Sequence, residues 1–155
     1  MYEEIYSGIK RQQKAMELVR QLLLEEFDLL VLRDTEAIVH LEFSIHELLR
    51  QIATEKSCTI NLLAGQSLRN YAGSLAHDDA RLLLELYEQL DGLEQLCARQ
   101  AARNTELSLA LLDQSRLLLH GLHSRIVPKT ADIYGKKGAM RAVRRPEAAL
   151  LTGRL

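Results

Sequence analysis

No proline occurs in this sequence before Pro128, and that absence limits what the preceding residues can form. Proline ends or kinks helices because it has no amide hydrogen and its ring clashes with the preceding turn. The chain is also rich in leucine, alanine, glutamate and arginine, which favour helices, whereas it has no tryptophan and only 5% aromatic residues. Long, almost uninterrupted helices are therefore expected.

Two interruptions divide this region into three predicted helices, over about 3–32, 35–64 and 79–127. At the first interruption, Asp34 is expected to cap the second helix, because its carboxylate can accept a hydrogen bond from a free amide of the first turn. The second interruption runs from Gly65 to Asp79 and leaves room for a short helical turn around Ser67–Tyr71. All three long segments can therefore pack along one another as a bundle.

Apolar residues recur at intervals of three and four in each predicted helix, the pattern of helices that pack at shallow angles. In the first helix this alternation fails only at Gln12. We predict an all-α fold: an antiparallel bundle of three long helices, in which the first two form a coiled-coil-like hairpin and the third is longer. At 1.5 Å per residue the first two helices are about 45 Å long and the third about 70 Å.

The third helix is too long for the hairpin to cover along its whole length. Its surplus end, roughly Asn104–Ile126, should keep an apolar stripe without a full set of partners in the chain, and such stripes are usually binding surfaces. Asn104 is the polar residue on this seam. Two interpretations of it stand side by side: a contact to the backbone of a bound protein, or a buried amide that fixes the register of the bundle.

The segment after Pro128 has a different composition, since glycines and Pro146 interrupt it and basic residues replace leucine. Its basic residues are Lys129, Lys136, Lys137, Arg141, Arg144, Arg145 and Arg154, against only Asp132 and Glu147. We predict a flexible basic tail over 128–155, separate from a helical domain over 1–127. Such a tail suits contact with the acidic body of the protein, with an acidic partner or with nucleic acid.

No pattern for catalysis, a cofactor or a metal is found in the sequence. His46 and Glu47 begin a pattern like the zinc motif H-E-x-x-H, but the second histidine is replaced by Arg50. His120 and His123 share a helix face, but two ligands are too few to hold a metal. Because nucleotide-binding loops and nucleophile elbows are also missing, we expect neither an enzyme nor a cofactor-binding protein.

The sequence also indicates where the protein acts. Cys58 and Cys97 are isolated, as in proteins that keep their thiols reduced. No apolar run approaches the roughly 20 residues of a membrane span, and Met1–Lys10 lacks the features of a secretory signal. We expect a cytoplasmic protein with no membrane insertion. The tail has no interleaved aromatic residues to read bases, so no nucleic-acid partner is expected.

Three segments of the chain resemble the FlgN-like flagellar export chaperones. Leu41–Leu63 resembles the family's second helix, a run of leucine and isoleucine. Residues 102–112, in which Asn104 precedes Leu107, resemble part of the third helix. The segment Ile133-Tyr134-Gly135-x-x-Gly138 resembles the tyrosine-glycine stretch that opens the family's tail.

This resemblance implies that the chain binds the C-terminal helical segment of hook-associated (hook–filament junction) proteins, keeps them soluble and unassembled, and delivers them to the flagellar type III export gate. The implied client-binding residues are Asn104, Leu107, Leu111, Leu118, Leu122 and Ile126. Tyr134, Gly135 and Gly138 are the implied contact with the export gate, and the alternative for Tyr134 is packing on the bundle.

The residues by themselves leave two other classes open. One is a coiled-coil scaffold or adaptor that forms a homodimer through the same apolar stripe and has no export role. The other is a helical protein that associates with nucleic acid through the basic tail.

Overall fold

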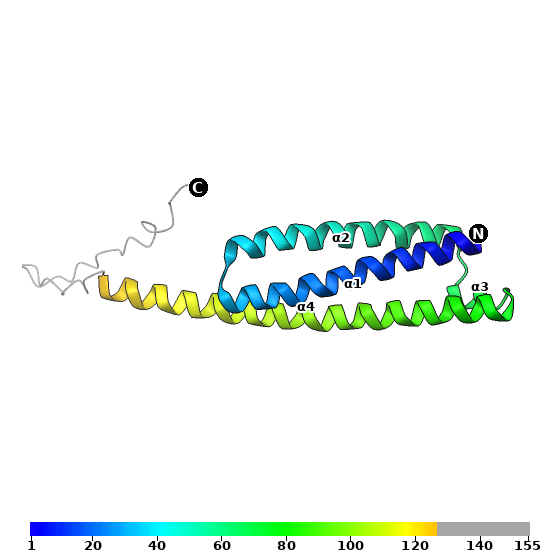
Figure 1. The fold of residues 1–155 in the computed structure, drawn as a ribbon. Helices are drawn as coiled ribbons and strands as arrows, with labels where there is room; N and C mark the ends of the chain where they lie inside the picture. Colours follow the sequence, from blue (N-terminus) through cyan, green and yellow to red (C-terminus); the bar gives the residue numbers. More distant parts are fainter. Residues whose placement is uncertain (127–155) are drawn as a thin grey trace, which may run out of the picture. The chain divides into compact units, whose positions relative to one another are not determined.

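The computed structural model describes residues 1–126, which form four helices (Figure 1). These helices are α1 (Tyr2–Leu32), α2 (Thr35–Leu62), α3 (Leu68–Ala72) and α4 (His77–Ile126). The described part contains no strand, so the predicted all-α class is confirmed. Short helix α3 lies in the connection where the sequence left room for a helical turn.

The chain divides into two compact units, Met1–Leu111 and Leu112–Leu155, and α4 runs from the first unit into the second. The first unit holds α1, α2, α3 and most of α4. In the second unit, only residues 112–126 are described. The predicted basic tail, 128–155, and the domain boundary before it therefore lie outside the described residues and stay predictions.

A two-residue turn joins α1 to α2. Arg33 adopts a left-handed φ of 59°. Its amide donates to the carbonyl oxygen of Leu30 at 3.1 Å, and the next amide donates to that of Leu29 at 3.1 Å. These bonds satisfy carbonyl groups that the end of α1 would otherwise leave free. The Asp34 carboxylate accepts a hydrogen bond from the amide of Ala37 at 3.1 Å, which confirms the predicted cap of α2.

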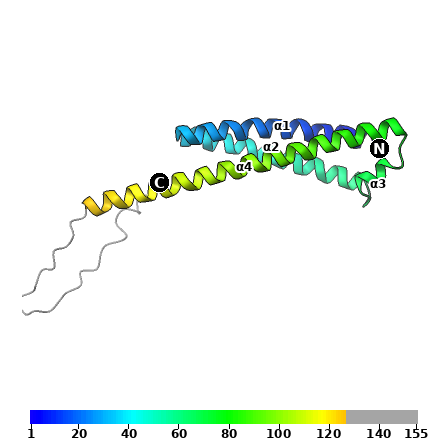
Figure 2. The same ribbon diagram turned by 90° about the horizontal axis from the view of Figure 1, so that it is seen from below.

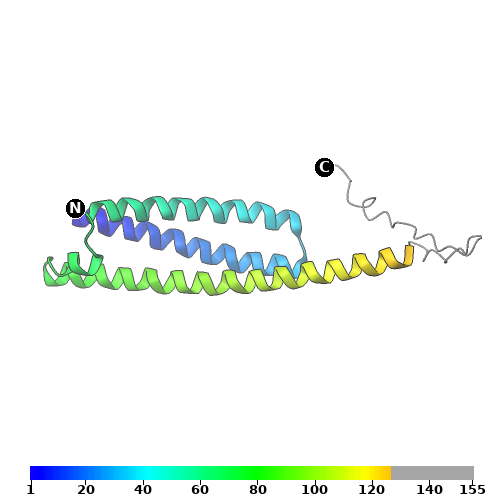
Figure 3. The same cartoon turned by 180° about the vertical axis from the view of Figure 1, so that it is seen from behind.

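Within the first unit, the tight turn makes α2 antiparallel to α1, whereas α4 runs in the same direction as α1 (Figures 1 and 3). The direction of α4 follows from two contacts. Cys97 and Asn104, seven residues apart on α4, reach the carbonyl oxygens of Met16 and Leu23, seven residues apart on α1. These pairs align α4 with α1 in the same direction.

The core of the first unit is built from the apolar residues at the three-four spacing. Ile5, Val19 and Leu83 are almost completely buried. Helix α3 adds Tyr71 and Ala72 to the same cluster, beside the first turns of α4 (Figure 2). The helices are therefore held chiefly by burial of aliphatic side chains along their seams.

Candidate functional site

Exposed leucines gather on the described part of the second unit, the end of α4. The large apolar side chains there are Leu112, Leu117, Leu118, Leu119, Leu122 and Ile126, and they are between 46% and 75% exposed. Scattered single leucines are normal on protein surfaces, but several that share one face of a helix mark a binding surface.

Most of the predicted client-binding residues share one face of α4. At 3.6 residues per turn, Leu107, Leu111, Leu118, Leu122 and Ile126 fall within an arc of about 100°. Leu112 and Leu119 lie just outside this arc, within about 40° of one edge. We call the seven residues together the leucine face. The sequence interpretation missed Leu112 and Leu119, although their seven-residue spacing to Ile126 was a usable signal.

Burial changes along the leucine face. Leu107 and Leu111, in the first unit, are half-buried, whereas Leu118, Leu122 and Ile126 are exposed. The members of the leucine face are therefore partly covered in the first unit and exposed on the described part of the second.

Asn104, the remaining predicted client-binding residue, lies inside the bundle and is only 3% exposed. Its amide nitrogen donates to the carbonyl oxygen of Leu23 at 2.7 Å and to the carboxylate of Glu26 at 2.6 Å. Its amide oxygen accepts a hydrogen bond from Gln100 at 2.9 Å. Asn104 is therefore buried and hydrogen-bonded within the bundle, and its contact with a client stays a prediction.

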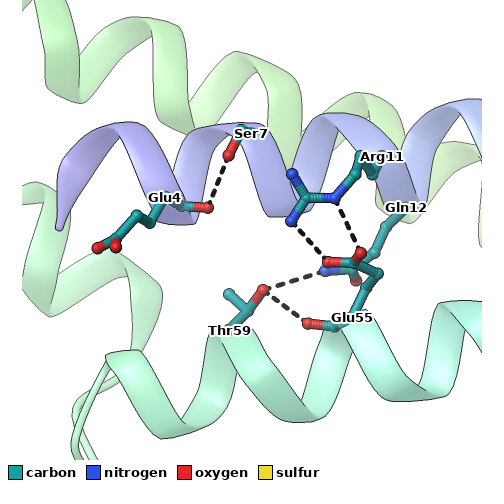
Figure 4. A network of polar contacts seen from close by, with 6 residues as sticks. All are labelled: Glu4, Ser7, Arg11, Gln12, Glu55 and Thr59. Carbon is teal, nitrogen blue, oxygen red and sulfur yellow. Dashed lines mark hydrogen bonds and ion pairs between the residues drawn. The ribbon is translucent and has the colours of Figure 1, made fainter.

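A polar network crosses the seam between α1 and α2 (Figure 4). The guanidinium of Arg11 donates two hydrogen bonds of 2.8 Å to the carboxylate of Glu55, and this pairing lowers the pKa of Glu55. Next to it, the buried amide of Gln12 donates to the hydroxyl of Thr59 at 3.2 Å, and that hydroxyl donates to the carbonyl oxygen of Glu55 at 2.9 Å. Gln12 therefore lies in the seam and is hydrogen-bonded there, although it interrupts the apolar spacing of this helix in the sequence.

The sequence matches the family described as FlgN protein over residues 1–142. The chain belongs to the FlgN family. FlgN proteins are flagellar export chaperones, so the predicted chaperone role in flagellar assembly is confirmed in this general form. No curated protein and no solved structure matches the sequence.

The FlgN match includes Tyr134, Gly135 and Gly138, the predicted contact with the export gate. These three residues lie outside the described part of the chain, so their role stays a prediction.

Residues 1–126 contain no group of three or more histidine, cysteine or acidic side chains placed to hold a metal ion. In the motif that resembled a zinc site, Glu47 instead pairs with Arg50 at 2.7 Å. Position 50 thus supplies an ion pair in place of a second metal ligand. Over the same residues, no helix is both long enough and apolar enough to cross a membrane.

Proposed function

We propose that this FlgN-family chain is a cytoplasmic flagellar export chaperone for hook-associated, hook–filament junction proteins. It binds the C-terminal helical segment of such a client, keeps the client soluble and unassembled, and delivers it to the export gate. The observation that supports this proposal is the leucine face of α4, which presents exposed aliphatic side chains in a chain of a chaperone family.

A client helix laid along the leucine face would bury side chains that now face water. Leu118 is 58% exposed and Leu122 is 53% exposed. About half of the transfer free energy of each leucine, or about 1 kcal/mol per residue, is therefore still to be gained. Association and ordering costs oppose this gain. A face with five such exposed residues, Leu112, Leu118, Leu119, Leu122 and Ile126, suits a complex that holds its client and still releases it.

The test is a calorimetric titration of the protein with the C-terminal segment of a hook-associated protein. Replacing Leu111→Asp together with Leu118→Asp should weaken binding at least about 30-fold, because each lost leucine contact is worth about 1 kcal/mol and 1.4 kcal/mol is a factor of ten. Unchanged affinity in this variant would show that the leucine face is not the binding surface.

A matched control uses two exposed leucines of α4 that point elsewhere. Leu109 and Leu117 are 56% and 74% exposed, and they lie roughly 130–150° around the helix from the centre of the leucine face. Leu109→Asp together with Leu117→Asp carries the same change in charge and hydrophobicity. This control should bind the client segment as the unmodified protein does.

We further propose that Tyr134, Gly135 and Gly138 contact the export gate, so that the helical domain, 1–127, holds the client while the tail, 128–155, reaches the gate. Tyrosine is a common anchor of small interfaces because it combines a large apolar ring with a hydroxyl. Tyr134→Ala should spare client binding in calorimetry and reduce secretion of the client in cells. Equal loss of both activities would argue against a separate gate contact.

A self-associating scaffold is the second candidate, because the same exposed leucines would equally suit a homodimer. Analytical ultracentrifugation over a concentration series separates the two functions. A chaperone should form a complex with the client segment in which no homodimer persists. A dimer that stays intact when the client segment is added would favour the scaffold.

A further inference from the structure

One series of α4 residues in the first unit, spaced seven apart, has a single amide side chain. It consists of Leu83, Leu90, Cys97, Asn104 and Leu111, and the next residue at this spacing is the exposed Leu118. The facing series on α1 consists of Tyr2, Ile9, Met16, Leu23 and Leu30. The Cys97 thiol donates to the Met16 carbonyl oxygen at 3.6 Å, and the Asn104 amide donates to the Leu23 carbonyl oxygen at 2.7 Å, so the two series are aligned in one heptad register.

Asn104 also donates a hydrogen bond to a carboxylate on α1, and the positions seven residues before and after that carboxylate do not carry another one. Its amide donates to the Glu26 carboxylate at 2.6 Å. One heptad before Glu26 the chain has the buried Val19, and one heptad after it the chain has Arg33. Neither side chain can accept a hydrogen bond from an amide. A slide of α4 by seven residues in either direction would therefore leave Asn104 without its carboxylate partner, which is unfavourable for a buried polar group.

The apolar residues of the series do not distinguish the observed register from one that is shifted by seven residues. If α4 slid by one heptad towards its own N-terminus, Leu111 would come to the level of Leu23 and Leu118 to the level of Leu30. Leucine would then face leucine at both levels. Hydrophobic contacts alone thus permit a register in which α1 would also cover Leu118, a member of the leucine face that is now exposed.

The connections between the helices show why this seam needs a polar contact. The hairpin of α1 and α2 is fixed by its two-residue turn, whereas α4 is joined to α2 through 63–76, a longer connection that contains α3. A longer connection restrains the axial position of a helix less than a tight turn does.

We infer that Asn104, Glu26 and the carbonyl of Leu23 form a register lock, which holds α4 on α1 in one heptad register and so keeps the leucine face from sliding under α1. A single buried asparagine in a coiled-coil seam sets register in this way at some cost in stability. The consequence for the leucine face rests on the proposed function, whereas the lock itself does not.

The test measures the axial position of α4 in the full chain. Spin labels are attached at Glu17→Cys on α1 and Glu88→Cys on α4, with Cys58→Ser and Cys97→Ala removing the native thiols, and pulsed electron paramagnetic resonance gives the distance between them. Adding Asn104→Leu should produce a second population, displaced along the helix axis by about 10 Å, the length of one heptad. A single, unchanged distance would overturn the inference.

Gln12→Leu is the matched control, because it also replaces a buried amide in a helix seam. Gln12 donates to Thr59 across the hairpin, where the tight turn already fixes the register. This variant should keep a single distance. A second population in Gln12→Leu would mean that any lost seam amide loosens the bundle, and it would overturn a specific role for Asn104.

A second variant moves the amide by one heptad, through Asn104→Leu together with Leu111→Asn. The new amide can reach Glu26 and the Leu23 carbonyl only if α4 slides, so the main population should appear at the longer distance. An unchanged distance in this variant counts against the lock. If it does not fold, the Asn104→Leu distances decide, since leucine is suited to a seam position. These distances are measured without client, so the lock and client binding can fail separately.

Discussion

Gly8 of α1 should resist replacement by alanine, although alanine is the better helix former. Gly8 is buried against α2, and a Cβ atom placed on it would lie 3.1 Å from the hydroxyl oxygen of Thr59. That hydroxyl cannot move freely, because it accepts a hydrogen bond from Gln12 at 3.2 Å and donates one to the Glu55 carbonyl oxygen at 2.9 Å (Figure 4). The added methyl group must therefore displace a fixed polar atom.

Two opposing contributions determine how much Gly8→Ala changes the free energy of unfolding. Alanine gains about 1 kcal/mol over glycine in a helix interior. Displacing the Thr59 hydroxyl weakens its bond to the buried amide of Gln12, and an unsatisfied buried polar group costs about 1–3 kcal/mol. Gly8→Ala should therefore lower the free energy of unfolding by about 1 kcal/mol. In a Thr59→Ala background the hydroxyl is gone, so Gly8→Ala should raise the free energy of unfolding by about 1 kcal/mol.

Urea unfolding of the unmodified protein, the two single variants and the double variant measures whether the effect of Gly8→Ala on stability changes sign when Thr59 is replaced. Gly92→Ala is the control for helix propensity, since nothing lies within 4 Å of a Cβ atom placed on Gly92. This control should stabilise the protein by roughly 0.5–1 kcal/mol. If Gly8→Ala stabilised the protein as much as Gly92→Ala does, the close approach of α1 and α2 at Thr59 would be refuted.

Two further predictions concern single ionisable groups. Hydrogen bonds from Arg50 and then Gln51 hold the pKa of Glu47 at about 2, so any stability from this carboxylate is present above its unfolded pKa and lost as the pH falls towards the folded value. An NMR titration should find that low midpoint, and Arg50→Ala should raise it; a midpoint near 4.3 in the unmodified protein would contradict the pairing. Burial raises the pKa of the Cys97 thiol, whereas Cys58 is exposed. Iodoacetamide should therefore modify Cys58 in the folded protein and Cys97 only after unfolding, and equal rates would contradict the packing of α4 on α1.

The helices themselves follow from local properties of the sequence. The long proline-free region, the three-four spacing of apolar residues and the Asp34 cap all act within a few residues. They predicted both ends of each of the three long helices to within two residues. The exposed leucines at the end of α4 could also be predicted, because the length of each helix follows from its residue count.

The partners of the polar seam residues could not be predicted, because they come from distant parts of the chain. Gln12 interrupts the apolar spacing of α1, and only the position of Thr59, 47 residues later, shows that it is satisfied in the seam. Asn104 likewise depends on Glu26 and Leu23, and its bond to the Leu23 carbonyl joins residues 81 positions apart. Helical periodicity gives the face on which a residue lies but not the register between helices.

Hydrogen exchange read by mass spectrometry, with and without the C-terminal segment of a hook-associated protein, tests the central claim most directly. The leucine face should be covered when the client binds, so exchange should slow at least tenfold in peptides spanning 107–126, while peptides from the α1–α2 hairpin should change little. Slowed exchange confined to the hairpin, or no change within 107–126 at saturating client, would contradict the assignment of the leucine face as the client-binding surface.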